Sequence, residues 1–134
     1  MYSPSGAIAQ YQQVNNVGQV EDASPHRLIL MLMAGAVDRL AQARSAIERK
    51  DISLKGRMIS KATNIIEGLQ GNLDRQQAPE YAENLDRLYD YMQRRLLEAN
   101  LNNDISLLDE VSELMRTIKS GWEEIEPGRS SAMS

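Results

Sequence analysis

The stretch NLDRLYDYMQRRLLEANLNND, residues 84–104, decides the fold because it has the periodicity of an amphipathic helix. At about 100° per residue, most of its large apolar residues fall into one sector of the helix. We expect this sector to be a stripe buried against the rest of the domain. The predicted stripe contains Leu85, Leu88, Tyr89, Met92, Leu96 and Ala99.

Two bulky residues of the same stretch lie outside the stripe. Tyr91 falls to one side of it and Leu97 to the other, while Arg87, Asp90 and Arg94 occupy the remaining face. A single buried stripe does not explain why positions 91 and 97 carry large apolar side chains. They therefore need a second explanation.

Capping signals place two helices upstream. The segment ASPHRLILML begins the first, since Ser24 can cap free backbone N–H groups and Pro25 suits the first helical position. We expect this helix to run to about Arg49, and the second to run from near Asp51 to about Leu73. The buried side of the second should carry Leu54, Met58, Ala62, Ile65, Ile66, Leu69 and Leu73. Its solvent side should carry Lys55, Lys61, Asn64 and Glu67.

Breaks in the pattern place the remaining two helices. The loop DRQQAPE precedes the third, and Pro79 fits its first turn. The residues Asn-Asn-Asp at 102–104 end the third helix and supply a cap for the fourth, which Pro127 terminates. The buried stripe of the fourth should contain Leu108, Val111, Leu114, Met115, Ile118, Trp122 and Ile125.

Four helices of roughly 20 residues joined by short loops predict an all-α fold, an antiparallel up-down four-helix bundle. No segment alternates with a period of two, so no strand is required. We expect the bundle to occupy residues 24–126. A mobile N-terminal arm or short helix (1–23) should precede it, and a disordered tail (127–134) should follow.

Composition restricts the function. The chain has 134 residues, of which 42% are hydrophobic and 25% charged, as in one soluble globular domain. Its net charge of -4 argues against a nucleic-acid partner. The absence of cysteine excludes disulfides and thiolate chemistry. The longest apolar run, Leu28 to Val37, is about half of what spans a bilayer, and no basic residue precedes Arg27, so we expect a cytoplasmic location without membrane insertion.

The chain shows no catalytic constellation. His26 is the only histidine, which excludes a metal site built on several histidines, and its place in a first helical turn predicts a surface position. The carboxylate pairs Asp109 with Glu110 and Glu123 with Glu124 are adjacent in sequence, so their side chains point in different directions. No glycine-rich loop could hold phosphate. We therefore predict neither an enzyme nor a cofactor.

The first long helix has surplus apolar residues as well. Its predicted stripe contains Ile29, Met33, Ala36, Leu40, Ala43 and Ile47. Leu30, Met31 and Val37 fall on other sides, so the first two turns are apolar nearly all round. One explanation is a central helix touched by several neighbours or covered by the arm. The other is a second apolar face that receives a partner.

These segments together resemble the FliS family, the flagellar secretion chaperones for flagellin. The resemblance is carried by NLDRLYDYMQRRLLEANLNND, by ASPHRLILML upstream and by EVSELMRTIKSGWEEI downstream, and it covers about Ala7 to Glu126. The chain departs from the family at Met33 and Ala34, where relatives usually carry a tyrosine and an acid. Any polar contact made by those two residues is not expected here.

The resemblance implies a cytosolic chaperone that binds the C-terminal segment of flagellin, prevents early polymerisation and presents the client to a component of the flagellar type III export gate. Family members also contact flagellar regulators, including an anti-sigma factor. From the residues alone, a structural homodimer is the alternative, because a second apolar face suits an oligomer contact equally well.

The helical periodicity and the resemblance to the family together suggest candidate site residues. The candidate walls of a flagellin-binding groove are Leu28, Leu32, Val37, Leu40, Tyr91, Leu97, Leu101 and Trp122. The resemblance also implies that the segment AIAQYQQ lies in or near this groove, with Ile8 and Tyr11 as its anchors. We expect these two residues to plug the apolar surface until flagellin arrives.

Overall fold

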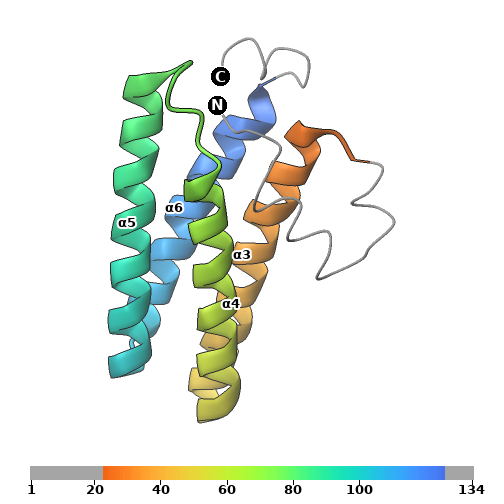
Figure 1. Cartoon of the computed structure of the whole chain (residues 1–134). Coiled ribbons are helices and arrows are strands. Elements are labelled where there is room, and N and C mark those ends of the chain that lie inside the picture. The colour runs from red at the N-terminus through yellow and green to blue at the C-terminus, as the bar shows by residue number, and fades with distance from the viewer. Residues whose placement is uncertain (1–22, 126–134) are drawn as a thin grey trace.

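The computed structural model describes residues 23–125. These residues form four helices and no strand (Figure 1). The helices are α3 (Pro25–Glu48), α4 (Ile52–Gly71), α5 (Pro79–Asn102) and α6 (Ile105–Glu124). The predicted arm and tail, with Ile8 and Tyr11, lie outside the described residues.

The four helices form one antiparallel bundle in which each helix runs opposite to the one before it (Figure 1). Helix α3 packs against α4 and α6, and α5 packs against the same two neighbours from the other side. Short turns join α3 to α4 and α5 to α6, and a longer loop at residues 72–78 joins α4 to α5. The predicted up-down bundle is confirmed.

Side chains cap three of the four helices, and two of these caps, Ser24 and Asp104, were predicted from the sequence. Ser24 and Asp51 each accept a hydrogen bond at 3.1 Å from the backbone N–H three residues later. Asp104 accepts one from the N–H of Ser106 at 3.0 Å. Asn103 adopts the left-handed conformation, with φ 52°, and so ends α5 before that cap. These polar residues satisfy backbone groups that a helix end leaves free.

The core is made by the predicted stripes. Tyr89, Met92 and Leu96 of α5 have no exposed surface, and Leu85 is 4% exposed. Buried stripes of α3, α4 and α6 complete one continuous apolar cluster. Fully burying side chains of this size contributes about 1.5–3 kcal/mol each, so the stripes provide most of the favourable free energy of folding.

The apolar side chains at the start of α3 are buried or partly buried within the bundle. Leu28, Ile29, Leu32 and Met33 are buried, and their neighbours Leu30 and Met31 are partly buried against the core, as is Val37. Since α3 contacts both α4 and α6, its core-facing surface is wider than one stripe. The first of the two explanations for this helix, contact with several neighbours, therefore accounts for its surplus.

The prediction that Lys55 lies on the solvent side of α4 is wrong. Its side chain is buried, and Nζ donates hydrogen bonds to the backbone oxygen of Asn100 at 2.9 Å and to Oδ1 of Asn103 at 2.5 Å. The ammonium group thus satisfies acceptors at the C-terminal end of α5, where the helix dipole favours positive charge. The wheel missed this position because the partners belong to another helix.

The prediction that His26 lies on the surface is also wrong, because its side chain is buried. Its ring stacks on the indole of Trp122 with the centroids 5.0 Å apart and the planes inclined by 17°. Nε1 of Trp122 donates a hydrogen bond to the backbone oxygen of His26 at 3.0 Å. Together, His26 and Trp122 join the first turn of α3 to the last turn of α6.

Candidate partner-binding surface

The structure divides the predicted groove residues between the core and the surface. Four are buried, namely Leu28, Leu32, Leu40 and Trp122. Val37 and Tyr91 are partly buried. Leu97 is 63% exposed and Leu101 is 74% exposed. The described chain therefore does not present all eight residues on one surface, and only the two leucines of α5 are freely accessible.

A third exposed apolar residue, Ile52, joins these leucines. It lies at the first position of α4 and is 71% exposed. Sequence reasoning missed it because the predicted stripe of α4 began at Leu54. The available signal was a large apolar residue directly after a capping aspartate, away from that stripe. We call Ile52, Leu97 and Leu101 the apolar face.

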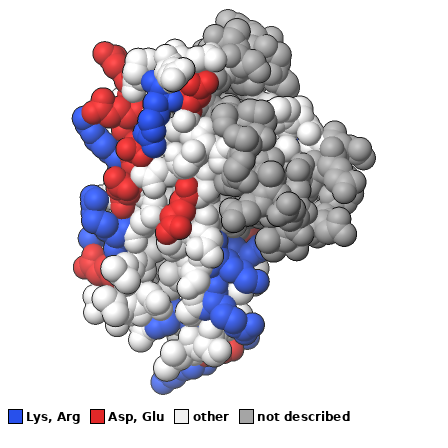
Figure 2. Space-filling view, in the orientation of Figure 1, with Lys and Arg blue, Asp and Glu red and all other residues white. Residues whose placement is uncertain are grey.

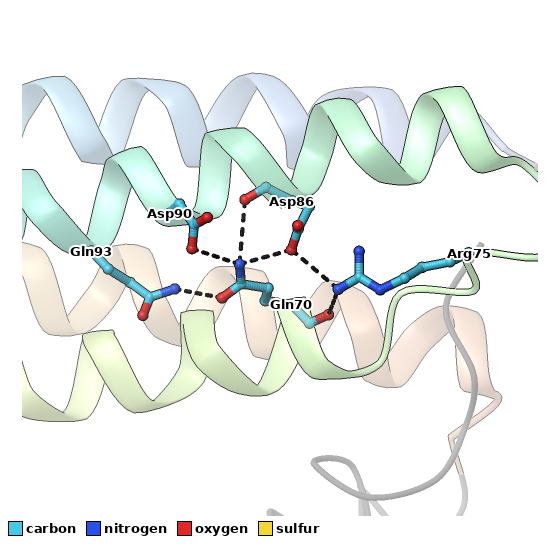
Figure 3. A network of polar contacts seen from close by, with 5 residues as sticks. All are labelled: Gln70, Arg75, Asp86, Asp90 and Gln93. Atoms are coloured by element: carbon cyan, nitrogen blue, oxygen red, sulfur yellow. Dashed lines mark hydrogen bonds and ion pairs between the residues drawn. The ribbon is translucent and has the colours of Figure 1, made fainter.

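A polar network shows which flanks of α4 and α5 meet (Figure 3). Nε2 of Gln70 lies 2.8 Å from Oδ1 of Asp86 and 2.8 Å from Oδ1 of Asp90. Nε2 of Gln93 donates to Oε1 of Gln70 at 2.8 Å, and Arg75 forms an ion pair with Asp86 at 3.1 Å. The hydrogen bond from Gln70, and then the one from Arg75, lowers the pKa of the Asp86 carboxyl group.

Helical periodicity extends the same flanks to the apolar face. Ile52 precedes Gln70 by 18 residues, which is about five turns, so both lie on the side of α4 that faces α5. Leu97 follows Asp86 by 11 residues, about three turns, and so lies on the side of α5 that faces α4. The seam between these helices is thus polar in one half and exposed and apolar in the other.

Lys55 brings the two parts of the apolar face to the same level of the bundle. Its bond to Asn100 joins the first turn of α4 to the last turn of α5. Ile52 lies one turn before Lys55, and Leu101 directly follows Asn100. Beside them, a Cβ added at Gly56 would meet no atom of residues 23–125 within 4 Å, so the described bundle leaves this flank of α4 uncovered.

Basic residues are concentrated in the turn before α4 and in the first half of this helix. Residues 49–66 contain five Lys and Arg and one Asp, although the whole chain has 15 basic and 19 acidic residues. Within the described residues, Arg57, Lys61 and Arg94 form no ion pair. Figure 2 shows basic side chains gathered at the lower end, where α4 begins, near uncharged surface.

Tyr91, which the wheel left unexplained, joins α5 to α6. Its hydroxyl donates to Oε2 of Glu110 at 2.7 Å, and Arg95 Nε donates to Oε1 of the same carboxylate at 3.1 Å. The guanidinium of Arg95 also lies 5.5 Å from the centroid of the Tyr91 ring. The bond from Tyr91, followed by that from Arg95, lowers the pKa of Glu110. Tyr91 is thus engaged within the bundle.

The geometry of residues 23–125 offers a surface for a partner rather than a chemical centre. No group of three or more His, Asp or Glu side chains in this range is placed to hold a metal ion. None of its helices combines the length and apolar character that a membrane span requires. The feature left to explain is the apolar face.

Comparison with known proteins identifies the family. Residues 7–129 match the family model described as "Flagellar protein FliS". The chain is 58% identical over 119 residues to the flagellar secretion chaperone FliSB of Pseudomonas aeruginosa, covering 89% of this chain and 94% of that protein.

Two further relatives carry the name flagellar secretion chaperone FliS. The one from Salmonella typhimurium is 48% identical over 128 residues, covering 95% of this chain and 94% of the relative. The one from Vibrio cholerae is 41% identical over 122 residues, covering 91% and 90%. The chain therefore belongs to the FliS family of flagellar secretion chaperones.

Proposed function

We propose that this chain is a cytosolic export chaperone that binds the C-terminal region of flagellin, prevents its premature polymerisation and assists its delivery to the flagellar type III secretion apparatus. The single observation that carries the proposal is the apolar face in a member of a flagellar chaperone family. Large apolar side chains grouped on the surface of a bundle are typical of a protein interaction site.

The chemistry of the client agrees with such a surface. A filament subunit buries its terminal segments against neighbours, so the free subunit exposes apolar segments that associate readily. A bundle with an accessible apolar face can bind such a segment as a helix, by insertion of side chains. Ordering the segment costs conformational entropy, so the contact has to be extensive. Binding and release of this kind need no cofactor.

The predicted groove residues take different parts in this proposal. Leu97 and Leu101 would contact the client directly, whereas Val37 on α3 and Tyr91 on the α6 side of α5 belong to other faces of the bundle. The buried residues Leu28, Leu32, Leu40 and Trp122 support the surface from the core, where they would be reached only if helices moved apart. Delivery would add a component of the export gate as a partner, and flagellar regulators are further candidate partners.

The N-terminal arm forms a separate part of the proposal. Ile8 and Tyr11 would cover apolar surface in the free chaperone and leave it when flagellin binds. Deletion of the residues before Val20 is then expected to alter the affinity for flagellin and to increase binding of a hydrophobic dye. An unchanged isotherm together with unchanged dye binding would remove the plug from the proposal.

A pull-down tests the proposed function. The chain is expected to capture flagellin from its own organism, and to lose that capture when the last ~40 residues of flagellin, a length sufficient for several helical turns, are removed. The double variant Leu97→Ser, Leu101→Ser should also lose capture while it keeps its helix content. Equal capture of full-length and shortened flagellin would contradict the proposal.

A structural homodimer is the second candidate, because exposed leucines also suit contact between two copies. Sedimentation over a range of concentrations separates the two. A chaperone is expected to form a complex with flagellin whatever its own oligomeric state. A tight dimer that persists when flagellin is added would favour the structural role.

A further inference from the structure

We propose that Lys50, Arg57 and Lys61 form a second binding surface, which takes an acidic segment of another protein. The proposal goes beyond the proposed function, because this basic surface lies apart from the apolar face and does not depend on flagellin. Three observations support it: the direction in which the cations of α4 point, the lack of carboxylates that pair with them, and the backbone conformation of Lys50.

The cations of α4 point away from α5. Arg57 and Lys61 follow Ile52 by five and nine residues, so they lie about 140° and 180° around the helix from it. Both are exposed, and they are one turn, or about 6 Å, apart along the helix. Because Ile52 lies on the side that faces α5, a partner held by Arg57 and Lys61 leaves the apolar face free.

Lys50 occupies a backbone position that favours another residue type. Its φ is 60°, in the left-handed region, and it directly follows the C-cap of α3. Its N–H donates to the backbone oxygen of Ile47 at 3.1 Å, and the N–H of Asp51 donates to that of residue 46 at 2.8 Å. These two bonds make a Schellman motif, in which the left-handed residue is usually glycine and sometimes asparagine.

The turn between α5 and α6 has the favoured residue type at the equivalent place. There Asn103 has φ 52°, a conformation that asparagine tolerates. The dipole of α3 does not explain the choice of Lys50, because Arg49 already places a cation at that helix end, with Nε 3.4 Å from the oxygen of Ser45. A lysine kept in a strained conformation indicates that its side chain has a role outside the fold.

The carboxylates of the described bundle leave the basic surface without partners. Within residues 23–125, none of its three cations forms an ion pair. Asp51 instead caps α4 through a hydrogen bond of 3.1 Å, and Asp38 pairs with Arg39 at 2.9 Å. Glu67, the single acid within α4, lies about 120° around the helix from Lys61. The basic surface is therefore free to attract carboxylates from outside the bundle.

The surroundings favour a protein segment over a lipid or a nucleic acid. The exposed residues beside the cations are small and polar, namely Ser53, Ser60 and Asn64. No large exposed apolar residue among residues 23–125 lies on this side of α4, so none is placed there to enter a bilayer. The net charge of -4 opposes binding of nucleic acid. Two cations one turn apart match two carboxylates one turn apart on a helix.

Paired peptides test the basic surface on the full chain. Two peptides of about 18 residues, or five helical turns, would carry either glutamate or lysine at every fourth position of an alanine and glutamine background. The chain is expected to bind the glutamate peptide at least about tenfold more tightly at about 50 mM NaCl, with the difference shrinking at about 300 mM because salt screens exposed charges. Equal affinities, or preference for the lysine peptide, would overturn the proposal.

Charge reversal locates the binding. The variant Arg57→Glu, Lys61→Glu is expected to raise the Kd for the glutamate peptide about tenfold, since attractions become repulsions. The matched control is Arg87→Glu, Arg116→Glu, which makes the same change in net charge at exposed arginines elsewhere. Its Kd should stay within about threefold of that of the unmodified chain, and both variants should keep their helical circular dichroism. Equal effects of the two variants would mean that net charge alone attracts the peptide, against the proposal.

The variant Lys50→Gly separates binding from stability. Glycine adopts the left-handed conformation without strain, so the urea midpoint of unfolding should rise by roughly 0.3 M. Loss of the cation should raise the Kd for the glutamate peptide about threefold. Lys50→Arg keeps both the charge and the strain and is the control that should change neither quantity. A Lys50→Gly chain that binds the peptide as tightly as before would contradict the role given to Lys50.

Two rival occupants have their own outcomes. Binding to vesicles of phosphatidylglycerol and phosphatidylcholine that Arg57→Glu, Lys61→Glu abolishes, without discrimination between the peptides, would indicate a membrane and overturn the proposal. Self-association at low salt that the same variant abolishes would indicate a second copy of this acidic chain, again against the proposal. A chain that selects the glutamate peptide, and neither binds the vesicles nor self-associates through these residues, supports the acidic protein segment.

Discussion

The indole of Trp122 donates a hydrogen bond to the backbone oxygen of His26 at 3.0 Å and stacks on the ring of the same residue. These residues are 96 positions apart in the chain, so the contact closes the bundle between its first and last helices. Because Trp122 is the single tryptophan, its fluorescence reports on this junction.

Replacing Trp122 with phenylalanine should destabilise the bundle. The variant keeps an aromatic ring but removes the Nε1 donor, and the loss of one hydrogen bond of this kind costs about 0.5–1.5 kcal/mol. Urea unfolding followed by circular dichroism measures the change in the free energy of unfolding. Tyr81→Phe, which removes the hydroxyl of a 46% exposed tyrosine, is the control and should have little effect. Equal stability of the two variants would contradict this account.

His26 should make the stability depend on pH. Burial lowers the pKa of His26 below its ordinary value of 6.5, so the unfolded chain takes up a proton first as the pH falls. The contribution of His26 is therefore complete above about pH 6.5 and is lost as the pH falls through the lower pKa of the folded state. Nδ1 of His26 is buried and forms no hydrogen bond, so the protonated ring finds no acceptor there.

Urea unfolding between pH 8 and pH 5 measures this effect against His26→Phe, which can keep the ring contact but cannot titrate. The free energy of unfolding of the unmodified chain should fall more steeply below about pH 6.5 than that of the variant. Parallel profiles would show that His26 does not titrate differently in the folded and unfolded states.

Replacing Lys55 with methionine should weaken the contact between α4 and α5. The change removes the two hydrogen bonds from Nζ to Asn100 and Asn103, and we expect a loss of about 1–2 kcal/mol. Arg57→Met, on the same helix but exposed, should change stability by no more than about 0.5 kcal/mol. A loss no greater than that of the control would mean that water replaces the ammonium group at no cost.

Leu96 and Leu97 provide a matched pair for separating core from surface. Leu96 has no exposed surface, whereas Leu97 is 63% exposed. Leu96→Ala should lower the free energy of unfolding by about 2–5 kcal/mol, and Leu97→Ala by no more than about 0.5 kcal/mol. On the proposed function, Leu97→Ala should instead weaken flagellin binding. A large loss of stability in Leu97→Ala would place this residue in the core.

Local signals in the sequence were sufficient for the helices. Ser24, Asp51 and Asp104 cap their helices because each needs only the backbone a few residues away. The stripe of Tyr89 and Met92 is buried because a helix that packs on one side requires it. Short loops then leave the up-down bundle as the simplest arrangement.

Contacts between residues on different helices could not be predicted from these local signals. Lys55 is buried because its acceptors lie on α5, and His26 is buried because Trp122 returns to it from the end of the chain. A helical wheel contains neither neighbour. For the same reason, Leu28 could not be distinguished from Leu97 as a surface residue before the packing of α3 was known.

Because residues 23–125 form four helices in an up-down arrangement, both ends of the described bundle lie on the same side. The bundle begins at Pro25 and finishes at Glu124, so the chain enters and leaves at the end closed by His26 and Trp122. Helices of 20 to 24 residues place the turns near Lys50 and Asn103 about 30 Å away, at the end that carries the apolar face. Within residues 23–125, the fold thus separates the two ends of the bundle, at Pro25 and Glu124, from the apolar face.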